Sequence, residues 1–187
     1  GQITQATQYV EPLVRVSTGQ GPIWLTVASK FAPFGYVPAE IRGVEAFVLT
    51  EAGPKKIVTP AGGTEDSVTY EGTVDLAADG SAKLNLVQSF SGKYAMAVRS
   101  AFIQLPESQL RDLVESKLLA RALRGARLLS HEITHLDDLD HPLLLKMKAE
   151  MPGFAQSVGG DLSISPPFSP RVAQLATLPA RQTPLMI

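Results

Sequence analysis

The chain has 187 residues, a formal net charge of −1 and a hydrophobic content of 44%. This length and composition are typical of one globular domain, or of one domain and part of another, with a buried core. Acidic and basic residues are interspersed, so we expect no nucleic-acid surface, and no apolar run is long enough to span a membrane. Cysteine is absent, which excludes disulfides, thiolate metal sites and a cysteine nucleophile.

The first 60 residues predict short strands around one ordered loop. Residues 1–10 are polar and aperiodic, so we expect a loosely held lead-in there. Residues 31–43 combine two prolines and two glycines with apolar rings, which predicts an ordered loop tucked onto a neighbour. The predicted strands lie at residues 13–16, 23–27, 44–50 and 54–60.

The stretch from residue 69 to residue 105 predicts the hairpin around which the chain is organised. Asp79 and Gly80 separate two β-leaning runs, which predicts a two-residue type I′ turn. On the return arm, Leu84 and Leu86 fall on one apolar face. Because that face has to be covered, the rest of the chain must supply a second layer.

One amphipathic helix is predicted at about residues 106–124. Gly125 follows it and is well placed to end it. Four apolar residues recur at helical spacing and predict a buried stripe: Leu110, Leu113, Val114 and Leu118.

The remaining residues predict more strands and complete the fold class. Residues 126–135 and 143–151 form a strand pair, residues 159–164 another strand, and residues 165–170 break regular structure. The predicted class is mainly β (α+β), an antiparallel β-sandwich-like domain with one packed amphipathic helix. The best predicted domain boundary is at residues 61–66 (AGGTED), and it divides the chain into residues 1–60 and 61–187.

One motif resembles a metal site. His131, Glu132 and His135 match H-E-x-x-H, a helical zinc pair with a glutamate base, and His141 stands where metzincins place a third ligand. The pattern requires a helix, and Gly125 ends the preceding one. In a strand, residues 131 and 135 would lie about 13 Å apart. We therefore predict a strand without a metal site, and keep a zinc-dependent hydrolase as the alternative.

Other motifs give no catalytic, cofactor or metal residue. Asp137, Asp138 and Asp140 lack the glycine and the closing glutamate of a calcium loop. No serine lies in a G-x-S-x-G elbow, and no glycine-rich loop leads from a strand into a helix. We predict no cofactor.

Two long segments resemble a known family. Residues 24–49 (WLTVASKFAPFGYVPAEIRGVEAFVL) resemble the end of the transglutaminase-like core of large bacterial multidomain proteins. Residues 70–99 (YEGTVDLAADGSAKLNLVQSFSGKYAMAVR) resemble the opening of the β-rich C-terminal domain of unknown function that follows this core. Residues 136–147 (LDDLDHPLLLKM) and 180–187 (ARQTPLMI) resemble later strands of that domain.

The resemblance implies a non-catalytic role. Such cores use a Cys-His-Asp triad, whose cysteine and histidine would lie upstream of this chain, and Thr26 stands where the family has its aspartate. Residues 1–60 would then be a remnant of the core and an ordered linker, and residues 61–187 an accessory or interaction domain. The implied partner is the upstream core of the same parent chain, or another protein. The resemblance favours a location in the periplasm or elsewhere outside the cytoplasm.

Overall fold

The computed structural model describes residues 11–164, so the expectations for residues 1–10, 165–170 and 180–187 lie outside the described range. All strand pairs are antiparallel, and the mainly β, α+β class is confirmed. The strands are β1 (Leu13–Thr18), β2 (Gly21–Thr26), β3 (Glu45–Thr50), β4 (Gly53–Val58), β5 (Val68–Leu76), β6 (Ala82–Phe90), β7 (Arg127–Thr134), β8 (Leu143–Met151), β9 (Ala155–Val158) and β10 (Asp161–Ile164). The helical segments are η2 (Ala39–Ile41), α1 (Lys93–Phe102), α2 (Glu107–Leu113), η3 (Val114–Leu119) and α3 (Ala120–Ala122).

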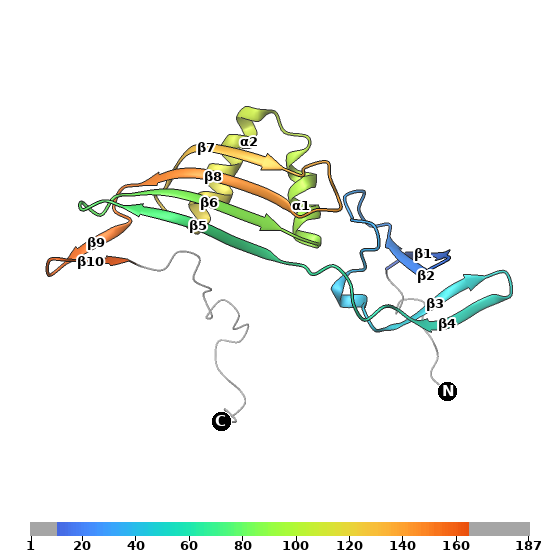
Figure 1. The fold of residues 1–187 in the computed structure, drawn as a ribbon. Coiled ribbons are helices and arrows are strands. Elements are labelled where there is room, and N and C mark those ends of the chain that lie inside the picture. The colour runs from blue at the N-terminus through green and yellow to red at the C-terminus, as the bar shows by residue number, and fades with distance from the viewer. Residues whose placement is uncertain (1–10, 165–187) are drawn as a thin grey trace, which may run out of the picture.

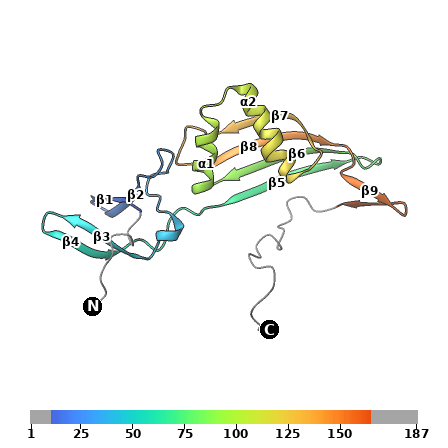
Figure 2. The ribbon, with the colours of Figure 1, turned by 180° about the vertical axis from the view of Figure 1, so that it is seen from behind.

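One four-stranded sheet with the strand order β5-β6-β8-β7 forms the body of the molecule. The helices lie against one face of this sheet, and no element within residues 11–164 covers the other face, which is called the open face below (Figure 1 and Figure 2). The hairpins β1–β2 and β3–β4 lie beyond one end of the sheet, and β9–β10 lies beyond the other end. Among residues 11–164, no helix has the length and apolar character needed to cross a membrane.

The core lies between the sheet and the helices. Alternate residues of β6 and β8 face the helices, so Leu84 is 2% exposed while Leu143 and Leu145 are fully buried. Val114 and Leu119 meet them from the helical layer and are also fully buried. The apolar face predicted for the hairpin is therefore covered by helices.

The predicted helix is present as one continuous run from Glu107 to Ala122. Its middle turn, η3, is wound as a π-helix. A π turn holds one extra residue, so the apolar stripe moves by one position after Val114. Leu119 is therefore fully buried, and the predicted Leu118 is only partly buried.

The helix α1 is an element that the sequence analysis did not predict. Its buried residues are Ala95, Arg99 and Phe102, at the i, i+4, i+7 spacing of a helix. The charged residue in the middle of this stripe hides the apolar periodicity. The backbone amide of Lys93 donates to Asp66 Oδ1 over 2.7 Å, which satisfies a donor in the first turn.

The turn between β5 and β6 differs from the predicted type I′ turn. The amide of Ala77 donates to Ser81 O over 2.8 Å, and the amide of Gly80 donates to Ala77 O over 3.0 Å. Gly80 has a φ of +82°, whereas Asp79 stays at negative φ. The type I′ prediction is therefore wrong, because this is a longer loop with a left-handed glycine after the turn. Asp79 Oδ1 stabilises it by accepting from the amide of Ser81 over 2.9 Å.

The loop that precedes β3 is ordered, as predicted. Phe31 is 8% exposed, and Tyr36 and Val37 are each 1% exposed. Arg42 Nη2 donates to Thr64 O over 2.6 Å, and the Tyr36 hydroxyl donates to Asp66 Oδ1 over 2.8 Å. The predicted boundary at residues 61–66 lies in the connection between β4 and β5, and its role as a domain boundary stays a prediction.

Candidate functional site: the open face of the sheet

The face of the sheet opposite the helices is polar. Side chains alternate between the two faces along each strand, so the residues between the buried positions of β6 and β8 point to this open face. The strand register aligns them in rows that cross all four strands. The central row consists of Thr73, Asn85, Lys148 and Ser130.

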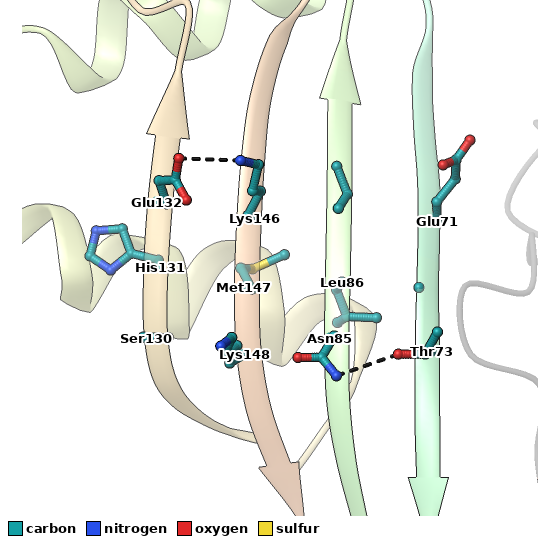
Figure 3. Close-up of a pocket in the computed structure, with 12 residues that line it drawn as sticks. Glu71, Thr73, Asn85, Leu86, Ser130, His131, Glu132, Lys146, Met147 and Lys148 are labelled. Carbon is teal, nitrogen blue, oxygen red and sulfur yellow. Dashed lines mark hydrogen bonds and ion pairs between the residues drawn. The ribbon is translucent and has the colours of Figure 1, made fainter.

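A hollow of about 750 Å³ lies over this central row (Figure 3). Asn85 Nδ2 donates to Thr73 Oγ1 over 3.4 Å, and Lys146 Nζ donates to Glu132 Oε1 over 3.2 Å (Figure 3). Within residues 11–164, Lys148 Nζ has no carboxylate at ion-pair distance. Glu71, Glu132 and Lys146 also line the hollow, and Lys146 is paired with Glu132. Within its own central row, Lys148 is the one charged residue among neutral hydrogen-bonding groups, which suits a carboxylate or another acceptor.

A neighbouring row of the same face is charged but balanced. It alternates in sign across the sheet, and Arg127 forms an ion pair with Glu150. The row consists of Asp75, Lys83, Glu150 and Arg127. Its opposite charges lie side by side, so Lys148 differs from these residues in lacking an acidic neighbour in its own row.

The H-E-x-x-H residues lie in a strand. His131 faces the helices, its side chain is 7% exposed, and its Nε2 lies 3.3 Å from Glu107 Oε1. Glu132 points to the opposite face, where it pairs with Lys146. The strand predicted at residues 126–135 is confirmed, and the helical geometry that a zinc hydrolase of this type needs is not formed.

The other two histidines come together in the loop after β7. The ring centroids of His135 and His141 are 5.3 Å apart. His135 Nδ1 lies 3.0 Å from Pro142 O, and His141 Nδ1 lies 2.8 Å from Asp138 Oδ2. This contact with His141 holds the pKa of the Asp138 carboxyl below its usual value. Across residues 11–164, no three histidine or acidic side chains are grouped so as to hold a metal ion.

Arg99 holds this loop in place from inside the molecule. It is 1% exposed, and its guanidinium donates to the carbonyl oxygens of His135, Asp138 and His141 over 3.0, 2.5 and 2.8 Å. Burial lowers the pKa of Arg99, and the nearby Asp138 carboxylate raises it. Arg99 thus supplies hydrogen-bond donors to three carbonyl oxygens of this loop, in place of backbone amides.

The outer edge of β7 is closed by side chains of the helix next to it. Arg111 Nη2 donates to Leu128 O over 2.7 Å, and Glu115 Oε1 accepts from the Leu128 amide over 3.0 Å. The pairing of β7 with β8 also shifts register between Leu128 and Ser130. A bulge and occupied backbone groups both hinder the addition of a further strand.

Comparison of the chain with protein-family models, curated proteins and solved structures gave no match. The open face is therefore interpreted from its geometry alone. Asn85 and Lys148 were not among the site residues predicted from the sequence. The signal that could have found them is the alternation of polar and apolar residues in 143–151, which places every charged residue of that strand on one face.

Proposed function

We propose that the chain is a non-catalytic accessory or interaction domain of a bacterial transglutaminase-like protein, acting outside the cytoplasm. The observation that carries this proposal is the open face of the sheet. Helices cover the other face (Figure 1), whereas this one presents a hollow lined by hydroxyl, amide, ammonium and carboxylate groups. Such a face suits recognition of a polar protein surface, and it offers no aromatic platform in its central row for stacking a sugar.

The residues also support a role without catalysis. The sequence has no cysteine, so it has no thiolate to attack a carbonyl. Thr26, at the position of the family's aspartate, accepts the amide of Ala28 through its hydroxyl over 3.3 Å. A hydroxyl engaged in a local turn does not stabilise an imidazolium as a carboxylate does. On the open face, Ser130 is next to His131, but the two side chains point to opposite faces, so they form no nucleophile–base pair.

The partner that we propose is the core that precedes this domain in the parent protein, with a separate protein as the other outcome. The loop that precedes β3 is tied to the first turn of α1 through Asp66, whose Oδ1 accepts from the Tyr36 hydroxyl and from the Lys93 amide. A joint of this kind fixes the direction in which a preceding domain leaves the sheet. The ammonium of Lys148 then selects a partner surface that presents carboxylates or carbonyls.

Binding of the separately produced upstream core tests this proposal by calorimetry. Lys148→Glu should weaken binding by about tenfold or more, because it reverses the one charge of the central row, which has no carboxylate at ion-pair distance within residues 11–164. The matched control, Lys117→Glu on the exposed side of the helical layer, should leave the affinity unchanged. Equal losses in both variants, or no binding by the parent chain, would contradict the proposal.

An activity assay tests the non-catalytic role separately. We expect no turnover of a glutamine-donor or peptide substrate by this chain. Turnover that a point substitution in the chain abolishes would overturn the proposal, whatever the binding experiment shows.

A further inference from the structure

In the described part of the chain, no element covers the outer edge of β5, in contrast to the outer edge of β7. Within residues 11–164, β5 pairs only with β6, and it does so over all nine residues from Val68 to Leu76 without a register shift. The strand contains no lysine, arginine or proline. Bulges, charged residues, above all lysine, and proline are the usual protections of an edge strand, and β5 has only the charges of Glu71 and Asp75 among them. Its outer backbone groups therefore stay accessible to another strand that can accommodate these two carboxylates.

The side of β5 that faces the helical layer is not fully covered. Val74 is 40% exposed and Leu76 is 38% exposed, although both share a face with the buried residues of β6. A strand added to this edge would bring further apolar side chains beside them. The edge therefore offers both backbone hydrogen-bonding groups and apolar surface.

We propose that two copies of the chain pair antiparallel through β5, about a twofold axis at Gly72. In this register, Glu71 lies opposite Thr73 of the second copy, and Thr69 lies opposite Asp75 of the second copy. Each carboxylate meets a hydroxyl that can donate to it. On the other face, Val68 lies opposite Leu76 of the second copy, so apolar residues also meet.

The order of residues along β5 selects a second copy in this register. An axis at Glu71 would place two Glu71 carboxylates opposite each other, and an axis at Thr73 would place Glu71 opposite Asp75. Like charges that face each other across two strands are destabilising. Only the axis at Gly72 avoids both contacts and also pairs all nine residues. This association uses the backbone edge of β5, and its Glu71–Thr73 pairs lie at the rim of the open face. It goes beyond the proposed function because its partner is a second copy of the chain.

The first experiment measures the mass of the full chain in solution by light scattering over a range of concentrations. We expect a species of twice the chain mass of 20.0 kDa, and dissociation on dilution. A chain that stays monomeric at every concentration overturns the proposal, including the case in which β5 receives a strand from another protein instead.

Engineered cysteines test the register, and the chain has no cysteine of its own to interfere. The double variant Thr69→Cys, Asp75→Cys should form covalent dimers under mild oxidation, because each cysteine faces the other type across the axis. The single variants should not, because two copies of residue 69, or of residue 75, would lie six positions apart, about 20 Å. Cross-linking in a single variant, or none in the double variant of a dimeric protein, contradicts this register.

Charge at residue 73 gives an independent test that does not depend on oxidation. Thr73→Lys places an ammonium opposite Glu71 of the second copy and should tighten the dimer, whereas Thr73→Glu should loosen it. Since the pair occurs twice, the dissociation constants should differ by about tenfold or more. Circular dichroism checks that both variants remain folded. Equal dissociation constants, with both variants folded, overturn the proposal.

Discussion

The two edge strands of the four-stranded sheet, β7 and β5, differ in how far other groups occupy their outer backbone atoms. At β7, Arg111 and Glu115 occupy the backbone groups of Leu128, and a register shift follows. At β5, residues 11–164 supply no further strand and the pairing with β6 is regular. Arg111 and Glu115 reach the edge of the sheet at β7, and β5 lies at the opposite edge. Whether an edge strand is protected therefore depends on its position relative to these two side chains. We expect substitutions near β7 to change stability and substitutions on β5 to change association.

The largest effect is expected at Arg99, which holds the loop that leaves the protected strand. Arg99→Met removes the donor to three carbonyl oxygens and should lower the free energy of unfolding by about 3–5 kcal/mol. Urea unfolding measures this loss. Arg99→Lys keeps the charge but not the fork of donors, so it should recover only part of the stability. A loss below about 1 kcal/mol in the methionine variant would contradict the role of Arg99.

The next largest effect is expected at the turn that leads out of the open-edged strand. Gly80 has a positive φ, and a Cβ there would lie 2.4 Å from Ala155 O. Gly80→Val should therefore cost at least about 2 kcal/mol in the free energy of unfolding. Asp79→Asn should leave the urea midpoint close to that of the parent chain, because an amide oxygen can still accept a hydrogen bond from the Ser81 amide. Equal urea midpoints for Gly80→Val and the parent chain would contradict the turn described above.

Opening the protected edge should have a moderate effect. Arg111→Ala leaves Leu128 O without its donor and should cost about 1–3 kcal/mol. Glu115→Gln should cost less than Glu115→Ala, because glutamine keeps an oxygen that can accept from the Leu128 amide. Arg124→Ala, on an exposed residue near the end of the same helical run, serves as the matched control in thermal unfolding. If Arg124→Ala lowers the melting temperature as much as Arg111→Ala, the contacts of Arg111 with the edge of β7 do not account for the loss of stability.

A smaller effect should appear with pH at Asp138. Because His141 lowers the pKa of its carboxyl in the folded state, the resulting stability is present above the ordinary carboxyl pKa and lost as pH falls through the folded pKa. The stability difference between the parent chain and Asp138→Asn should therefore narrow below about pH 4. Urea midpoints at a series of pH values check this, and a constant difference would contradict it.

The smallest effect on stability is expected at Thr69 on the open edge. Thr69→Ala should change the free energy of unfolding of the dilute monomer by less than about 0.5 kcal/mol, because the side chain is exposed. Its dimer should nevertheless dissociate more readily, since the partner of Asp75 is lost. A large loss of monomer stability would remove the contrast between the two edges.

The sequence alone determined the strands other than β9, the longer helix and the polar character of the residues around the candidate site. These features follow from periods of two and 3.6 residues, which are local. The same reasoning placed the H-E-x-x-H residues in a strand, because Gly125 ends the helix before them. Local patterns therefore separated the strand interpretation from the zinc interpretation.

The tertiary structure alone decided which polar and charged residues lie close together. Arg99 is buried because three carbonyl oxygens from residues 36 to 42 positions away in the chain surround it. Lys148 shares a row with Thr73 and Ser130 because β8 lies between β6 and β7, a strand order that no local pattern contains. The energy of a buried or aligned charge depends on groups distant in the sequence, so periodicity cannot predict it.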